Sequence, residues 1–484
     1  MNPNLGTPNL SNNPSRSNPS RSNPSRSNPS QGQGGWKACF LLLAFGLLCF
    51  AGSWALGFRA AAKGSPAIAA AEVKPTVLRQ SPRQVWYPLD NGLQFGSLPL
   101  PSFLPEEEQR AIIITSWNVG SLHDREGGSG RTHLLAELLR RSHNTPSAEG
   151  EVLVGTHRTW FIEKVPPKDV TEHLKKILDR IEFQQTDASL LGRVRGDLLA
   201  QQKKQRAELV TGLQDRVLDR LSALQSGPRG QYQLGDFNLD NLDQVRRELF
   251  TPANLHIAIV GPHDPAPTLE IAKTRFGKIT AGKPNQKIPN AKLLNGEIGV
   301  KRNKSGIPGA IIRSWRVPAP GSEQSLALGL LIPRLIRFLD SEGAKIIWEP
   351  KIEPEQLSVL IPIQPGELDA KTALLAARAR MDAAVAYALR PDVEMSDMQY
   401  ARKTMGGILG ISRVHDETSM YDPMPAAEAL MIQRLQNVDE RKLVNQFGRN
   451  VAEQLNQLET NYISPKLSVT GIVIPTQPAK NSKP

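Results

Sequence analysis

The stretch Leu249-Phe250-Thr251-Pro252-Ala253-Asn254-Leu255-His256-Ile257-Ala258-Ile259-Val260-Gly261 predicts how each half of this chain is built. Its apolar and β-branched run over 255–260 is typical of a strand, and the turn residues before it mark where that strand begins. A related stretch, Ser464-Pro465-Lys466-Leu467-Ser468-Val469-Thr470-Gly471, recurs near the end of the chain. A helical pattern precedes the strand in both places, so the sequence predicts a duplicated α+β unit.

Shifts in composition divide the 484 residues into segments. Residues 1–35 repeat Ser-Asn-Pro-Ser-Arg and offer nothing apolar to pack, which predicts a disordered, low-complexity tail. The rest is predicted as a membrane anchor over 36–58, a linker over 59–83, an N-terminal domain over 84–280, a linker over 281–305, a C-terminal domain over 306–476 and a disordered end over 477–484.

The run Ala38–Phe58 holds apolar or small residues almost without interruption and is long enough to cross about 30 Å of hydrocarbon. Trp36 and Phe58 bound the predicted anchor. A cleaved signal peptide is the alternative, but its apolar region would span only about 7–15 residues. More Lys and Arg precede the run than follow it, so we expect a cytoplasmic N-terminus and a globular body outside the cytoplasm, in a bacterial inner membrane and periplasm.

The net charge of +12 does not indicate a nucleic-acid partner. Half of this excess comes from the Arg and Lys residues that precede Glu72, a region without any Asp or Glu, and the remainder is spread over the body. A phosphate-binding surface requires clustered basic residues, and none is evident. Both cysteines, Cys39 and Cys49, lie in the apolar run, which excludes a disulfide framework, thiolate metal site or cysteine nucleophile in the body.

The segment Gly130-Arg131-Thr132-His133-Leu134-Leu135-Ala136-Glu137-Leu138-Leu139 carries part of a zinc-peptidase motif. The inverted motif H-x-x-E-H places two His ligands on one helix face with a Glu between them as general base. Here His133 supplies the first imidazole, Ala136 occupies the base position and Glu137 occupies the position of the second ligand. We therefore predict no catalytic residue at this helix. Glu137 can be a one-turn neighbour of His133 or a carboxylate ligand beside it.

Three stretches resemble the insulinase/pitrilysin family of zinc metallopeptidases, most closely its two-domain subunits typified by the mitochondrial processing peptidase. They are Leu89-Asp90-Asn91-Gly92-Leu93, Gly120–Asp124 with Gly130–Leu135, and the closing stretch Leu249–Gly261 followed by Asp264-Pro265 and Phe276-Gly277. The resemblance implies an α+β fold of two tandem homologous domains, each an antiparallel sheet with helices packed on one side. It further implies a peptide-binding chamber between paired halves or paired chains.

The resemblance also implies a zinc ligand from the helical region near 190–214. Glu208 is the candidate there, so His133, Glu137 and Glu208 would form the metal site if a rearranged one exists. Arg193 and Arg195 would bring positive charge to the same place. The Arg and Tyr with which family members hold a substrate backbone are not in place in the second half, although Arg334, Arg337 and Trp348 lie nearby.

These observations predict a membrane-anchored pitrilysin-like homologue without catalytic activity and without a cofactor. It would act as a partner subunit or as a scaffold for peptides or proteins. An active zinc endopeptidase with a rearranged site, and a purely structural envelope protein, are the alternatives. The expected partners are the membrane, a homo- or hetero-oligomer with a family member, and peptides.

Overall fold

The protein is represented by a computed structural model. The residues that it describes lie between 85 and 474, with several gaps inside this range. The segments outside the described residues are 125–129, 143–148, 183–186, 208–212, 215–216, 218–233, 236, 286–295, 301–308, 321, 323, 340–342, 350, 352, 364–368, 401–420 and 437–449. The described residues therefore do not include the predicted tail, the anchor or the first linker. They also do not include Trp36, Phe58 and Glu208. Within the described part of the chain, no helix is both long enough and apolar enough to cross a membrane.

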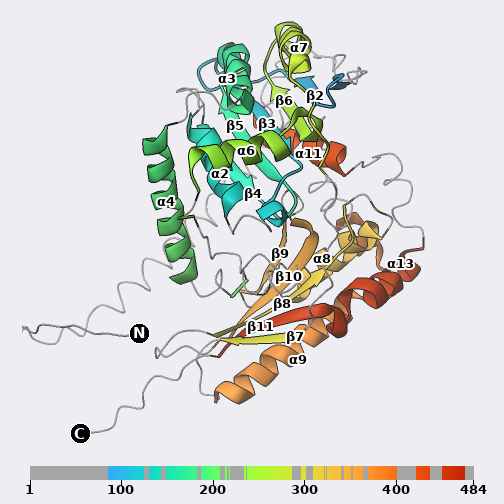
Figure 1. The fold of residues 1–484 in the computed structure, drawn as a ribbon. Coiled ribbons are helices and arrows are strands. Elements are labelled where there is room, and N and C mark those ends of the chain that lie inside the picture. The colour runs from blue at the N-terminus through green and yellow to red at the C-terminus, as the bar shows by residue number, and fades with distance from the viewer. Residues whose placement is uncertain are drawn as a thin grey trace, which may run out of the picture. The chain divides into compact units, whose positions relative to one another are not determined.

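The N-terminal half contains a six-stranded sheet with the strand order β1-β2-β6-β3-β5-β4 (Figure 1). The strands are β1 (Trp86–Pro88), β2 (Gln94–Pro99), β3 (Ala111–Trp117), β4 (Glu149–Val154), β5 (Thr159–Val165) and β6 (Leu255–Gly261). Strand β6 is formed by the apolar run of the stretch Leu249–Gly261, and it lies between β2 and β3 near the middle of the sheet. It is parallel to β2 and antiparallel to β3.

Helices pack on one face of this sheet and form the first core with it. They are α2 (Arg131–Ser142), α3 (Val170–Glu182), α4 (Ala188–Ala207), α6 (Leu239–Leu249) and α7 (Pro265–Thr274). Alternate strand residues such as Ile113, Phe161 and Ile257 point into this core, as the two-residue period of a strand requires. In α3, Leu174, Ile177 and other apolar residues recur at helical spacing and are buried.

The C-terminal half contains a second sheet with the order β7-β11-β8-β10-β9. Its strands are β7 (Gly296–Val300), β8 (Gly309–Arg316), β9 (Lys345–Glu349), β10 (Glu353–Ile363) and β11 (Ser468–Val473). The helices α8 (Ser325–Leu339), α9 (Ala370–Ala388) and α13 (Val451–Leu458) form the second core with one face of this sheet.

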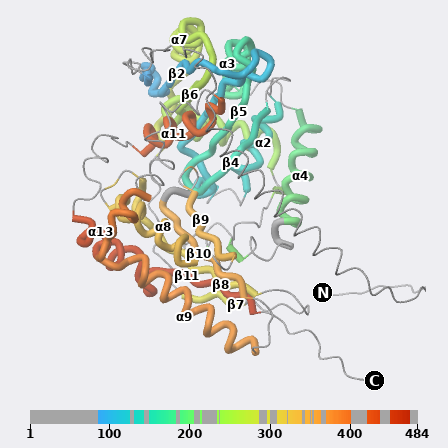
Figure 2. The backbone as a smooth tube through the Cα atoms, turned by 180° about the vertical axis from the view of Figure 1, so that it is seen from behind, coloured from blue at the N-terminus to red at the C-terminus, as the bar shows by residue number. Residues whose placement is uncertain are grey.

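The opposite face of each sheet is covered by a segment from the other half of the chain. Helix α11 (Met424–Leu435) packs on β3 and β6 of the first sheet (Figure 2). Leu213 and Val217 pack on the second sheet. A Cβ added to Gly471 of β11 would lie within 2.4 Å of Val217 Cγ2, so this close approach requires glycine. The two halves thus contribute reciprocally to each other's packing.

The expected α+β class is confirmed, with two corrections. Each sheet is mixed rather than antiparallel, because β2 pairs with β6 and β7 pairs with β11 in parallel. Helices also do not stay on one side, since α11 covers the second face of the first sheet. In addition, β7 lies in the segment predicted as the linker 281–305. Gly296, Gly299 and the polar residues nearby are not typical of a strand, so the sequence does not indicate one there. The domain boundaries themselves stay predictions.

Candidate functional site

The zinc-like helix α2 is held at its start by a buried carboxylate. Asp124 Oδ1 accepts hydrogen bonds from the Thr132 backbone N at 2.9 Å and from Thr132 Oγ1 at 2.6 Å, and Oδ2 accepts one from Gly130 N at 3.0 Å. Burial raises the pKa of Asp124 to about 6, although the bonds from Thr132 act against that rise. These contacts satisfy backbone N–H groups that a helix start leaves without partners, and they fix where His133 lies.

Ala136, which occupies the base position, belongs to the apolar core. Its side chain is fully buried together with Leu134, Leu135 and Leu138 of the same helix. It brings no group that can take a proton, so the helix has no general base there. His133 is partly exposed, and burial lowers its pKa below the ordinary value although the nearby Glu137 carboxylate acts in the opposite direction. The imidazole is therefore neutral at neutral pH.

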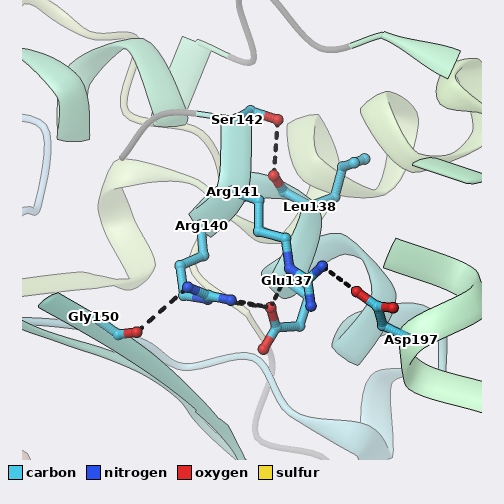
Figure 3. A network of polar contacts seen from close by, with 7 residues as sticks. All are labelled: Glu137, Leu138, Arg140, Arg141, Ser142, Gly150 and Asp197. Atoms are coloured by element: carbon cyan, nitrogen blue, oxygen red, sulfur yellow. Dashed lines mark hydrogen bonds and ion pairs between the residues drawn. The ribbon is translucent and has the colours of Figure 1, made fainter. Parts of the chain in front are cut away.

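Glu137 is the centre of an ion-pair cluster rather than an open carboxylate (Figure 3). Its Oε2 accepts hydrogen bonds from Arg140 Nη2 at 2.8 Å, from Arg140 Nε at 3.1 Å and from Arg141 Nε at 3.2 Å. Arg141 Nη1 also donates to Asp197 Oδ2 of α4 at 2.5 Å. We refer to Glu137, Arg140, Arg141 and Asp197 as the arginine cluster. It neutralises Glu137 and connects α2 to α4.

The arginine cluster opposes metal binding at this helix. A cation at Glu137 would lie beside two guanidinium groups, and their repulsion in a partly buried site is stronger than in water. The described residues include no group of three or more His, Cys, Asp and Glu side chains that could hold a metal ion. Of the predicted set, His133 and Glu137 share one helix, whereas Glu208 lies outside the described residues. The rearranged zinc site thus remains a prediction that these contacts do not favour.

The positive charge at this place comes from residues that the sequence analysis did not single out. Arg140 and Arg141 follow Glu137 by three and four positions, a spacing that brings helix side chains together and could have revealed them. The arginines expected to contribute make other contacts instead. Arg193 Nη1 donates to Ser189 Oγ at 3.2 Å, and Arg195 donates to the backbone oxygen of Phe237.

Arg334 of α8 is one of the arginines near the expected substrate-holding position. It is buried, and its guanidinium makes hydrogen bonds within the fold. Its guanidinium donates to Asp397 Oδ2 at 2.9 and 3.1 Å. It also donates to the backbone oxygens of Ala388, Arg390 and Asp392 at 3.3, 2.6 and 2.5 Å, which lie at and just beyond the end of α9. Arg334 therefore stabilises a helix end and has no remaining surface for a peptide.

Sequence comparison gives one family match. Residues 236–335 match the family described as the peptidase M16 inactive domain. This segment begins just before helix α6 and includes strand β6 of the first sheet. It continues through β8 and most of α8. No curated protein matches the chain.

Solved structures share the fold over most of the chain. A protease from Helicobacter pylori is similar with a TM-score of 0.62 and 13% identity, over 81% of this chain and 99% of that one. A peptidase M16 inactive domain from Pseudomonas fluorescens is similar with a TM-score of 0.62 and 14% identity, over 82% and 99%.

A chain of Complex III2 from Candida albicans is similar with a TM-score of 0.58 and 11% identity, over 81% and 96%. At these identities the structures show the fold alone, and the family match supplies the sequence evidence. Residues 236–335 thus match the peptidase M16 inactive domain in sequence, and the chain shares its fold with solved M16-like structures.

Proposed function

We propose that this protein is a membrane-anchored M16 homologue without peptidase activity that acts as a partner subunit or as a scaffold for peptides. The observation that carries this proposal is the state of α2. Ala136 takes the base position within the apolar core, and the Glu137 carboxylate is bonded to Arg140 and Arg141. A zinc peptidase requires about three protein ligands and a base that accepts the proton of the bound water. The absence of the base alone would lower the rate by roughly 10²–10⁴-fold.

The open edge of the first sheet supports a peptide-binding role. Strand β4 is the last strand of that sheet and pairs only with β5 among the described strands. It also lies against α2. An extended peptide can add to such an edge through backbone hydrogen bonds without any catalytic group. Glu149 and Glu151 are exposed on β4 and would favour a peptide with basic side chains.

A partner-subunit role is supported by the family rather than by a contact in this chain. One of the fold relatives is part of a multi-chain assembly, Complex III2. By analogy, we expect this chain to form a homo-oligomer or a hetero-oligomer with another M16 protein. Its anchor would be the apolar run bounded by Trp36 and Phe58, with the body in the periplasm.

The direct test is the activity and metal content of the full-length protein purified in mild detergent. We expect no cleavage of unfolded casein or of a fluorogenic peptide library, and no stoichiometric zinc by mass spectrometry. An active M16 peptidase purified in the same way is the positive control. Zinc-dependent cleavage that disappears in His133→Ala would overturn the proposal in favour of an active enzyme with a rearranged site.

Partner binding needs a separate experiment. Full-length protein should co-purify with an M16 protein that carries an intact H-x-x-E-H motif and is encoded nearby, or should be oligomeric by native mass spectrometry. Peptide binding at β4 should weaken when Val152 is replaced by Pro, because proline removes a backbone donor and disrupts a strand. A strictly monomeric protein that binds neither peptides nor an M16 partner would contradict the scaffold role.

A further inference from the structure

The face of the first sheet that α11 covers ends in a row of polar side chains. Gln94 of β2, His256 of β6, Ser116 of β3 and Trp160 of β5 are direct cross-strand neighbours, in that order. Residues two and four positions further along these strands, such as Ile114 and Ala258, pack against α11. Since alternate residues of a strand point the same way, the polar row points toward α11 as well. We call these four residues the polar row.

Three members of the polar row carry polar atoms that are buried and have no hydrogen-bond partner among the described residues. They are Ser116 Oγ, Trp160 Nε1 and His256 Nδ1. Ser116 and Trp160 are 0% and 1% exposed, so bulk water does not satisfy them. Side chains directly opposite each other in a sheet have Cβ atoms about 4.5–5.5 Å apart, so these groups can contact one ligand together. A buried polar atom without a partner is unfavourable for folding, and three in one row require an explanation.

Two guanidinium groups frame the polar row. Arg158 directly precedes β5, two positions before Trp160, and its Nη2 donates to Leu435 O at the end of α11 at 3.2 Å. Arg434 of α11 donates to Gln94 Oε1 and lies over the Trp86 ring at 5.7 Å. Arg434 is exposed and Arg158 is half-buried, whereas Ser116 and Trp160 are fully buried. Ser116 and Trp160 are therefore the buried end of this group of residues, and Arg434 is its exposed end.

Positive charge is in excess at this place. The charge of the Glu355 carboxylate acts on Arg158 and also on Arg316. Burial lowers the pKa of Arg158 to about 10 despite that carboxylate. Burial and the charges of Arg158 and Arg434 lower the pKa of His256 to about 4, so its imidazole is neutral. An anion between the two arginines would reduce their repulsion and the desolvation of Arg158.

We propose that the polar row and its two arginines form a binding site for a small oxyanion, a carboxylate or a phosphate. Arg158 and Arg434 supply the charge-assisted hydrogen bonds, and Ser116 and Trp160 donate from the floor of the site. His256 contributes a neutral ring nitrogen. The ligand must be small because α11 covers the floor. The site lies on the sheet face opposite to α2, so it is distinct from the zinc-like helix.

A structural role for the arginines is the competing explanation. Cations near the C-terminal end of a helix interact favourably with its carbonyl groups, and Arg158 contacts Leu435 O at the end of α11. A buried water molecule could likewise satisfy the floor of the site without any ligand. Neither alternative predicts saturable binding of an anion.

The test is a titration of the full-length protein in mild detergent with sodium phosphate and, separately, with sodium acetate. Sodium chloride at matched ionic strength serves as the reference, and calorimetry and thermal unfolding are the readouts. We expect one saturable site for at least one of the two probes, with a rise in Tm that chloride does not produce. The tighter probe identifies whether the oxyanion is a phosphate or a carboxylate.

Variants assign the binding to this site. Ser116→Ala removes a donor with little change in volume, and Arg434→Gln removes an exposed charge. Each should weaken the probe by roughly ten- to hundredfold, the effect of losing a hydrogen bond to a charged group. The control is Arg247→Gln on α6, an exposed arginine paired with Asp243, which should leave the affinity unchanged. No saturable binding by the wild type, or equal weakening in the control, would overturn the proposal.

Discussion

Arg141 connects two helices of the N-terminal half through two carboxylates. Its Nε lies 3.2 Å from Glu137 Oε2 one turn earlier in α2, and its Nη1 lies 2.5 Å from Asp197 Oδ2 in α4. A rearranged zinc site would require a metal ion between these two helices, whereas here a guanidinium joins them. Asp197 is well exposed, so the connection positions the helices more than it stabilises them.

The first prediction concerns this connection. Asp197→Asn should lower the free energy of unfolding by less than about 1 kcal/mol, because an exposed ion pair contributes little. Arg141→Gln should have a larger effect, since it also removes a contact to the less exposed Glu137. A double-mutant cycle measured by thermal unfolding isolates the Arg141–Asp197 term. A coupling energy of several kcal/mol would contradict this assignment.

The second prediction tests the core position of Ala136. Ala136→Glu should destabilise the protein by about 2–5 kcal/mol, because it adds both volume and a charge to a fully buried position. Ala136→Met is the matched control, since it adds comparable volume without the charge and should cost about 1–3 kcal/mol. The measurement is the shift of Tm at neutral pH. Equal effects of the two variants would show that the position opens to solvent.

The third prediction concerns metal removal. Because the Glu137 carboxylate is neutralised by Arg140 and Arg141, excess chelator should leave the Tm of the full-length protein unchanged. Glu137→His should instead increase zinc retention, since it places a second imidazole one turn from His133 and releases both arginines. Zinc bound per chain after dialysis is the readout. A fall in the wild-type Tm on chelation would reveal a metal site that this arrangement does not anticipate.

The fourth prediction follows from a buried acid of β5. Glu163 Oε1 lies 2.5 Å from Arg180 Nη2, Oε2 lies 3.1 Å from His173 Nε2, and all three side chains are fully buried. Burial raises the pKa of Glu163, but the charge of Arg180 and the contact with His173 outweigh it and lower the pKa to about 2. Its folded-state pKa is therefore below its unfolded value.

This depressed pKa fixes the sign of the pH effect. The stabilisation by Glu163 is fully present above pH 4.5, the ordinary pKa of the group, and is lost as pH falls from there toward about 2. Glu163→Gln should therefore destabilise the protein by about 3–5 kcal/mol at pH 7, because it leaves the buried Arg180 without its counter-charge. The difference from the wild type should shrink on acidification, as measured by thermal unfolding at pH 7 and at about pH 3, inside the window where the stabilisation is lost. A difference that does not depend on pH would contradict the ion-pair assignment.

The fifth prediction separates a structural arginine from a substrate-binding one. Arg334→Gln should destabilise the protein by about 2–4 kcal/mol, because several buried acceptors lose charge-assisted bonds at once. Arg337→Gln, the control, removes one bond to the same Asp397 from a much more exposed side chain and should have a small effect. Neither variant should change peptide affinity at a temperature where both are folded. A loss of peptide binding in a folded Arg334→Gln protein would instead assign a substrate-holding role to Arg334.

Much of the fold could be predicted because its signals are local. The apolar run of β6, the helical spacing in α3 and the repeated closing stretch each depend on residues close together in the chain. The hairpin of β4 and β5 was not predicted, because Glu149, Gly150 and Glu151 interrupt the strand pattern at an edge that does not need to be apolar on both faces. Strand β7 was hidden by its glycines in the same way.

The same distinction between local and long-range signals applies to the candidate site. The sequence by itself determined that Ala136 replaces the base and that Glu137 lies one turn from His133, since these follow from residue identity and helix geometry. Only the tertiary structure decided that Asp197 of α4 meets Arg141, that Arg334 serves the end of α9, and that Gln94, His256, Ser116 and Trp160 form one row. These contacts join residues that are far apart in the chain. Strand register and helix packing bring the residues together, and no local sequence pattern encodes either of them.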